Sequence, residues 1–152
     1  MLFGFGRNTN SALGNGNREH QAGLCFIKEM DGIVAIASGS DHTLLLTREG
    51  EVYVCGTNFE NQLGTGNFVN HDKFHLLVKD ASICHIACGG EFSFIYKNNG
   101  ELLSFGRTHL FLFRFFRVYI SQEEITKESA GLEVPRSYEF LLWCLVIPES
   151  RR

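Results

Sequence analysis

The sequence has no concentrated positive charge. Its 152 residues contain 14 Lys and Arg against 17 Asp and Glu, and residues 1–108 carry 8 basic and 11 acidic side chains. A protein that binds nucleic acid through its phosphates needs a basic stripe that displaces counterions. This sequence has no such stripe, so we expect no direct binding of DNA or RNA through charge.

Long apolar runs are also missing. The first residues, Met1 to Arg7, lack the cationic start and the apolar stretch of a signal peptide. The segment from Leu110 to Ile120 is apolar, but it contains Arg114 and Arg117 and is shorter than the roughly twenty residues that span a bilayer. We therefore expect a protein without a transmembrane segment, located in the cytoplasm or the nucleus.

The five cysteines do not form a disulfide pattern, because their number is odd and their spacing is unpaired. Cys55, Cys84 and Cys88 lie in or beside apolar runs, so we expect them to be small buried thiols. Alternation along a strand would place Cys84 and Cys88 on one face of a sheet core, so we predict no metal site. Zinc is the alternative, because three histidines are near in the sequence: His71, His75 and His85.

The glycines do not form a phosphate-binding loop. Gly4-x-Gly6 lacks the third glycine and the following helix of a dinucleotide fingerprint. The segment from Leu13 to Gly16 lacks the lysine of a phosphate loop. We therefore expect no cofactor and no catalytic residues, and we predict that the chain is not an enzyme.

What the sequence does contain is a repeat with a period of fifty residues. Comparing positions 2–17 with 52–67 gives six identities in sixteen without an insertion. Glycines recur at the same offset, as Gly39 and Gly89 show, and Gly56 has counterparts on both sides. A constant period of this length indicates an array of similar structural units.

Each unit is predicted to consist of four short strands and no helix. The segment Ile33–Ser38 is small and apolar, as in a strand buried on both faces. Gly50 and Gly100 follow polar residues between apolar runs, which is typical of hairpin turns. We therefore expect an all-β fold, an incomplete β-propeller of four-stranded units. The predicted strands are Leu2–Gly6, Leu24–Ile27, Ile33–Ser38, Thr43–Thr47, Glu51–Cys55, Phe74–Val78, Ile83–Cys88, Ser93–Tyr96 and Leu102–Phe105.

The segment from Ile36 to Leu46 resembles the signature of the regulator of chromosome condensation repeat: two small residues, Gly, two free positions, His and then aliphatics. In the second copy Phe92 replaces the His and Tyr96 replaces an aliphatic residue. Kelch repeats have a similar period but lack this signature. The resemblance covers about residues 2–108. The residues that carry it are Gly39, His42, Gly50, Gly56, Asn58, Gln62, Leu63, Gly64, Gly66, Gly89, Gly100 and Gly106.

The resemblance implies functions that depend on loops. Family members that catalyse guanine-nucleotide exchange use one face of a complete propeller to hold a small GTPase, with acidic residues just ahead of the repeat His. Asp41 and Glu91 occupy this position here. Many relatives instead act as non-catalytic interaction modules, attached to ubiquitin-ligase, kinase or cytoskeletal modules. We predict an interaction module that binds a protein partner, with nucleotide exchange as the alternative. These residues also have a purely structural explanation, in which Asp41 caps a turn and Glu91 is merely solvated. For His42 the structural explanation is an imidazole bonded to backbone in a partly buried corner.

The repeat stops near residue 108. We divide the chain into repeats at 1–108, with a partial unit at 1–23 and full units at about 24–73 and 74–108, and a divergent tail at 109–152. The tail is expected to be mixed or helical, with a helix capping box at Ser121–Glu124. Its first apolar segment, Leu110–Ile120, would lie against the open edge of the second unit or at a membrane surface. Two full units cannot close a ring, so we expect the chain to associate with other chains or to be part of a longer protein.

Overall fold

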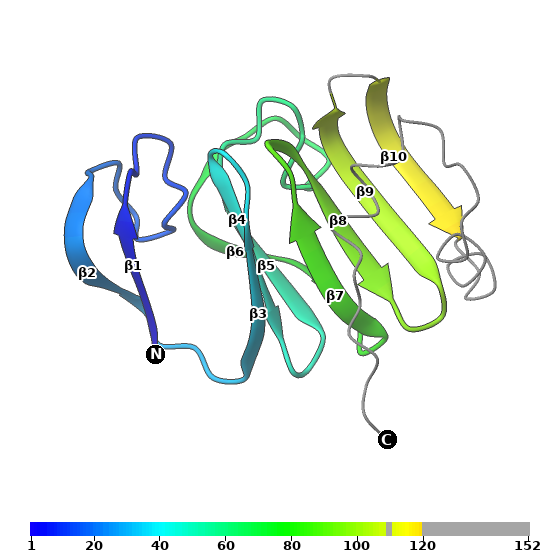
Figure 1. The fold of residues 1–152 in the computed structure, drawn as a ribbon, viewed down its shortest axis with the longest axis horizontal. Helices are drawn as coiled ribbons and strands as arrows, with labels where there is room; N and C mark the ends of the chain where they lie inside the picture. Colours follow the sequence, from blue (N-terminus) through cyan, green and yellow to red (C-terminus); the bar gives the residue numbers. More distant parts are fainter. Residues whose placement is uncertain (109–110, 120–152) are drawn as a thin grey trace, which may run out of the picture. The chain divides into compact units, whose positions relative to one another are not determined.

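The computed structural model of the chain describes residues 1–108 and 111–119. Over these residues it contains only β-strands, as Figure 1 shows, and no helix with the length and apolar character needed to cross a membrane. The expected all-β class is confirmed. The capping box at 121–124 and the rest of the predicted tail after residue 119 lie outside the described residues. The strands are β1 Leu2–Gly6, β2 Gln21–Lys28, β3 Ile33–Ser38, β4 His42–Thr47, β5 Glu51–Gly56, β6 His71–Lys79, β7 Ile83–Cys88, β8 Glu91–Lys97, β9 Glu101–Thr108 and β10 Phe111–Tyr119.

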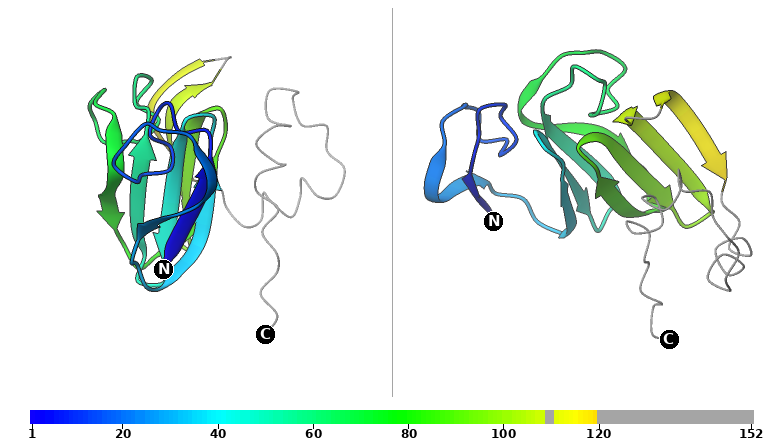
Figure 2. Two further views of the ribbon diagram at one scale, coloured as in Figure 1. Left: turned by 90° about the vertical axis from the view of Figure 1, so that its left-hand side faces the viewer. Right: turned by 45° about the horizontal axis from the view of Figure 1, so that its top comes forward.

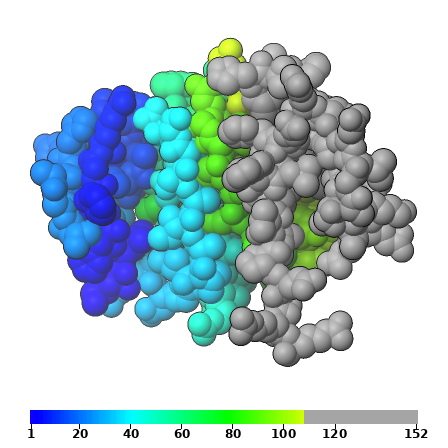
Figure 3. Space-filling view, viewed as in Figure 1, coloured from blue at the N-terminus to red at the C-terminus, as the bar shows by residue number. Residues whose placement is uncertain are grey.

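The strands form three antiparallel sheets. β3, β4, β5 and β6 make one four-stranded sheet in that order, β7 to β10 make a second one, and β1 pairs with β2. The left view of Figure 2 looks along the stack and shows the sheets one behind another. In Figure 3 the sheet of β1 and β2 is the blue band, next to the cyan band that belongs to the sheet of β3 to β6. Each sequence repeat begins with a strand that belongs to the preceding sheet. β6 pairs with β5, and β2 pairs with β1 in the same way.

The copies fold alike down to their irregularities. β3 has a register shift between Ile33 and Ala35, and β7 has one between Ile83 and His85, fifty residues later. The turns before β5 and β9 both place a glycine at positive φ, 75° at Gly50 and 87° at Gly100. An L side chain rarely adopts this conformation, so the glycine spacing records where the chain must turn.

The core lies between the two four-stranded sheets. β4 is buried along its whole length, since it pairs with β3 on one side and β5 on the other and packs against β7. Burial of these apolar side chains is the main term that holds adjacent sheets together. The buried cluster consists of Leu44, Leu46, Val52, Val54, Leu63, Ile83, Ile95 and Phe105.

Two burial predictions are wrong. β3 is not buried on both faces: Val34 and Ile36 remain 53% and 56% exposed. β1 and β2 correspond to β5 and β6 of a preceding unit, and the described residues contain no strands equivalent to β3 and β4 in that unit. Cys84 is exposed, whereas Cys55 is buried as expected.

β10 takes the outer place in the second sheet. It pairs antiparallel with β9, from Phe111 opposite Thr108 to Tyr119 opposite Glu101. Of the two positions considered for the apolar segment at 110–120, the structure therefore shows the open edge of the second unit. The link from β9 to β10 is short, whereas residues 57–70 separate β5 from β6.

Candidate functional site

The turns next to the candidate acidic residues meet at one end of the sheets. The turn from β3 to β4 contains Asp41, whereas Glu91, fifty residues later, is the first residue of β8, directly after the turn at Gly89 and Gly90. The backbone N–H of Ser40 donates to the carbonyl of Gly90 at 3.0 Å, which links the two turns. Asp41 is half-buried and Glu91 is exposed. Within residues 1–108 neither carboxylate forms a salt bridge, and it is the backbone carbonyl of Asp41 that holds the turn, by accepting a hydrogen bond from Thr57.

His42 connects the two four-stranded sheets. Its ring is fully buried, and its Nε2 lies 2.9 Å from the Ser93 hydroxyl. Ser93 donates to the carbonyl of Gln62 at 2.7 Å, so its oxygen accepts the His42 proton and the imidazole is the Nε2–H tautomer. The expected partly buried corner is wrong, because the ring is fully buried. A backbone carbonyl does bond the ring, that of Phe92, and the Ser93 side chain of the next sheet is an additional partner that was not expected.

The environment of His42 keeps it uncharged. Burial lowers the pKa of His42 to about 4, against the smaller raising effects of the Phe92 carbonyl and the Asp41 charge. A neutral imidazole without access to solvent cannot exchange protons with a substrate. The arrangement is suited to holding sheets together, and among the described residues no group of three His, Cys, Asp or Glu side chains is arranged to hold a metal ion.

In the second copy of the repeat, Phe92 occupies the position of His42 and packs in the same way. Phe92 packs on Gly89 as His42 packs on Gly39, and a Cβ added to either glycine would overlap the ring. In both copies a flat ring packs against the glycine at this position. In the first copy, His42 also makes a hydrogen bond to the next sheet. Sequence inspection missed Ser93, although the hydroxyl of Thr43 at the equivalent position was a usable signal.

The long loops after β1 and β5 are built on a buried asparagine. The Asn58 side chain accepts from the Leu63 N–H at 2.9 Å and donates to the Thr65 hydroxyl at 2.9 Å and the Asn67 carbonyl at 2.7 Å. Asn8 makes the matching bonds in the first loop, to Leu13, Asn15 and Asn17. In the second loop, Gln62 also accepts from the Glu60 N–H at 3.0 Å. Both loops are thus fixed by their own side chains.

Each long loop also contacts the following sheet. Gly64 packs on the ring of Phe105, and Arg107 pairs with Glu60 at 3.3 Å. In the first loop, Gly14 packs on Phe74 and the Cys55 thiol lies 3.3 Å from the Ala12 carbonyl. The loops therefore add to the contacts between sheets as well as forming part of the loop-bearing surface.

We expect Asn58→Ala to loosen the loop at 57–70. The substitution leaves a buried N–H at Leu63 without its acceptor and removes the bonds that close the loop, so unfolding should become easier by about 2–3 kcal/mol. Urea denaturation would measure the loss, and limited proteolysis should show faster cleavage within 57–70. Thr65→Ala is the matched control, because it removes the bonds of one hydroxyl, with the side chains of Asn58 and Asn67, but leaves the Leu63 N–H with its acceptor, and it should cost about 1 kcal/mol. Equal losses for the two variants would contradict the central role of Asn58.

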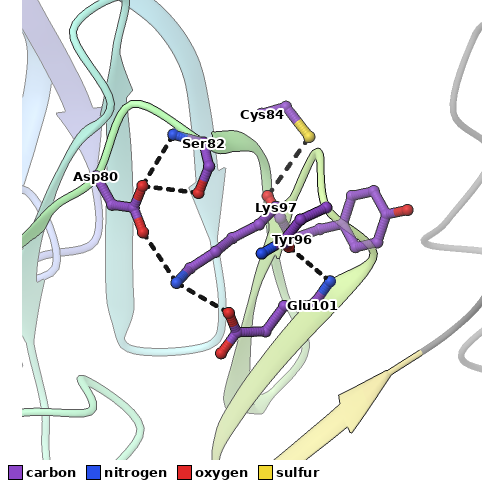
Figure 4. Close-up of polar contacts among 7 residues, drawn as sticks. Asp80, Ser82, Cys84, Tyr96, Lys97 and Glu101 are labelled. Atoms are coloured by element: carbon purple, nitrogen blue, oxygen red, sulfur yellow. Dashed lines mark hydrogen bonds and ion pairs between the residues drawn. The ribbon is translucent and has the colours of Figure 1, made fainter.

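A network of charged side chains, shown in Figure 4, lies at the opposite end of the second sheet and was not expected from the sequence. Lys97 contacts Asp80 at 2.9 Å and Glu101 at 3.1 Å, with only 12% of its side chain exposed. Hydrogen bonds from Ser82, and then from Lys97, hold the pKa of Asp80 well below its usual range, while Asp80 and Glu101 raise the pKa of Lys97. Because Lys97 and Glu101 flank the turn between β8 and β9, the network stabilises that turn, far from Asp41 and Glu91.

The geometry defines a class of protein: tandem four-stranded antiparallel sheets of the β-propeller type, joined by loops that fix one sheet on the next. Two family descriptions match the sequence. Both describe the Regulator of chromosome condensation (RCC1) repeat, one matching residues 1–46 and 49–96 and the other residues 33–62. The chain belongs to the regulator of chromosome condensation repeat family.

Named proteins similar to the chain share this repeat. Protein RCC2 homolog of Xenopus laevis is 38% identical over 109 residues, which are 69% of this chain and 21% of that protein. The secretion-regulating guanine nucleotide exchange factor of Bos taurus is 32% identical over 110 residues, 69% of this chain and 24% of that protein. The crystal structure of human WBSCR16 is similar with a TM-score of 0.61 and 26% identity, covering 70% of this chain and 29% of that one. The chain thus spans about a quarter or less of the length of these two relatives.

Proposed function

We propose that this chain is a protein-interaction module, in which the loops at one end of its sheets bind a protein partner. The observation that carries the proposal is the direct hydrogen bond between the turns of successive sheets, from Ser40 to Gly90 at 3.0 Å. It fixes the turn that contains Asp41 to the turn that precedes Glu91, and the side chains of both residues, which form no salt bridge within residues 1–108, are available to a partner. Binding residues on loops that a rigid scaffold positions are common in proteins.

The partner class we propose is a small GTPase, met in the cytoplasm or the nucleus. One similar protein carries the name guanine nucleotide exchange factor, and another is named X-linked retinitis pigmentosa GTPase regulator, from Canis lupus familiaris. The acidic turns fit a basic partner surface, since opposite charges speed association and exclude wrong partners. Nucleotide exchange itself is the second candidate, favoured by the name of the bovine relative.

We expect the chain to capture at least one purified small GTPase without accelerating release of its GDP. Asp41→Ala and Glu91→Ala should each weaken capture about threefold to tenfold, mainly by slowing association, because exposed charges act largely through steering. Fluorescent GDP release and surface plasmon resonance on a panel of GTPases would measure both quantities. Lys79→Ala, which removes an exposed charge at the other end of the sheet, is the control.

Two outcomes separate the candidates. Release of GDP that is accelerated by the chain and abolished by Asp41→Ala would replace the interaction module by an exchange factor. Absence of capture for every GTPase in the panel would contradict the GTPase as the partner class.

A further inference from the structure

The loop at 57–70 carries exposed apolar side chains that the equivalent first loop lacks. Phe59, Phe68 and Val69 are 67%, 64% and 60% exposed. At the positions fifty residues earlier, the chain has Thr9, Arg18 and Glu19. Because the first loop is built on the same asparagine pattern with polar tips, the apolar tips are not needed for the loop to fold.

The loop fixes the backbone that carries these three side chains before any partner arrives. Asn58 precedes Phe59 and bonds the carbonyl of Asn67, which precedes Phe68, at 2.7 Å. The Asn67 side chain accepts from the Val69 N–H at 2.9 Å, and the Asn70 side chain accepts from the Asn58 N–H at 2.7 Å. These bonds close the two ends of the loop on each other, so its three apolar residues belong to one pre-organised tip. Pre-organisation lowers the entropy cost of binding.

Two acidic residues lie at the base of the loop that carries this tip. Glu60 follows Phe59, and the loop starts at Thr57, whose N–H bonds the carbonyl of Asp41 at 2.8 Å. Arg107 balances the charge of Glu60 at 3.3 Å, while Asp41 forms no salt bridge within residues 1–108. A complementary surface would combine apolar side chains with Lys or Arg.

We propose that the tip formed by Phe59, Phe68 and Val69 is the anchor with which the chain docks a protein segment bearing aliphatic or aromatic side chains flanked by Lys or Arg. This inference rests on the proposed function, because it names the chemistry of the partner bound at the same loops. Aromatic side chains held on a rigid backbone are common energetic centres of protein interfaces, which have a polar rim. An anionic membrane surface fits less well, since the acidic neighbours of the tip would be repelled by it.

The test replaces the tip by the residues that the protein itself uses in its first loop: Phe59→Thr, Phe68→Arg and Val69→Glu in one variant. A library of random twelve-residue peptides displayed on phage is selected on the full chain, and the peptides recovered are measured against the variant. Expected are peptides rich in aromatic or aliphatic residues together with Lys or Arg, which bind the triple variant about a hundredfold more weakly. Leu24→Glu is the matched control, because Leu24 is 75% exposed outside the loop, and it should leave binding unchanged.

Several results would overturn the docking anchor. These are no enrichment of peptides, peptides without the expected composition, and equal binding to the triple variant. Two further measurements test other occupants: binding to phosphatidylserine vesicles, or dimerisation in light scattering, that the triple variant abolishes would assign the tip to a membrane or to a second copy. Failure of the GTPase panel together with tip-dependent peptide binding would reject the proposed partner class and retain the anchor. GTPase capture that the triple variant leaves intact would reject the anchor and retain the proposed partner class.

Discussion

Replacing Gly56 by alanine is expected to cost at least about 4 kcal/mol of folding free energy, which is most of the stability of a marginal repeat domain. Gly56 has φ +104°, and a Cβ there would overlap the backbone carbonyl of Asp41 and lie 2.7 Å from the Cα of His42. Both obstacles are main chain, at the first residue of the paired strand β4 and the residue before it, and main chain cannot move aside as a side chain could. Circular dichroism during urea titration at 25 °C would show an unfolded or nearly unfolded protein.

The repeat provides an internal control for this substitution. Gly6 is the counterpart of Gly56 fifty residues earlier, with φ +111°, but a Cβ there would meet nothing within 4 Å. Gly6→Ala should therefore cost only the backbone strain, about 1–3 kcal/mol. The difference between the two variants measures the clash with β4. Equal losses would mean that the conformation of the glycine, and not the close approach of the strands, explains its place in the repeat.

These glycines also explain why the sheets could be predicted from the sequence. A turn that needs positive φ leaves a mark in the residue type, and Gly50 and Gly100 mark the hairpins that join β4 to β5 and β8 to β9. Every predicted strand has a counterpart in the structure, with ends that differ by a few residues. The constant period then identified the sheets as copies of one unit, which a single strand pattern could not have done.

The contacts between sheets were less accessible to sequence reasoning. His42 and Ser93 are 51 residues apart, and strand periodicity describes only which face of a sheet a residue occupies. The partner of the imidazole was therefore sought in nearby backbone. For the same reason, the exposure of Val34 and Ile36 was missed: it depends on what lies opposite β3, and the composition of β3 carries no such information.

For the candidate site, too, some features could be predicted from the sequence and others could not. The position of Asp41 in a turn followed from the sequence, whereas Glu91, expected in a loop, is the first residue of β8. The hydrogen bond that joins the two turns depends on how the sheets stack. The exposed tip at Phe59 and Phe68 could have been noticed by comparing the two long loops residue by residue. What made it significant was the hydrogen-bonded frame that holds it.

Acidification is expected to destabilise the chain in a pH window set by His42. Its pKa is lowered by burial from about 6.5 to about 4 in the folded protein, so the unfolded chain takes up a proton at this residue as the pH falls below 6.5 and the folded chain does not. Stability is therefore fully present above pH 6.5 and is lost progressively down to about pH 4, by roughly 3 kcal/mol in total. Urea denaturation at a series of pH values between 7.5 and 4.5 would trace this loss, with midpoints compared at constant ionic strength.

His42→Phe isolates this effect from the other titrating groups. The packing of Phe92 on Gly89 shows that a phenyl ring fits this position of the repeat, so the variant should fold. It should lose about 1–2 kcal/mol at pH 7.5, because the Ser93 hydroxyl no longer receives the imidazole proton. Its stability should then fall much less between pH 6.5 and 4.5, because the variant lacks the buried imidazole of His42. The lowered pKa of His71 is unchanged and contributes equally to both proteins. Near pH 4.5 the variant should equal or exceed the original chain in stability, because the cost of keeping a buried imidazole uncharged is gone. Parallel pH profiles for the two proteins would show that His42 is not the residue whose burial resists protonation.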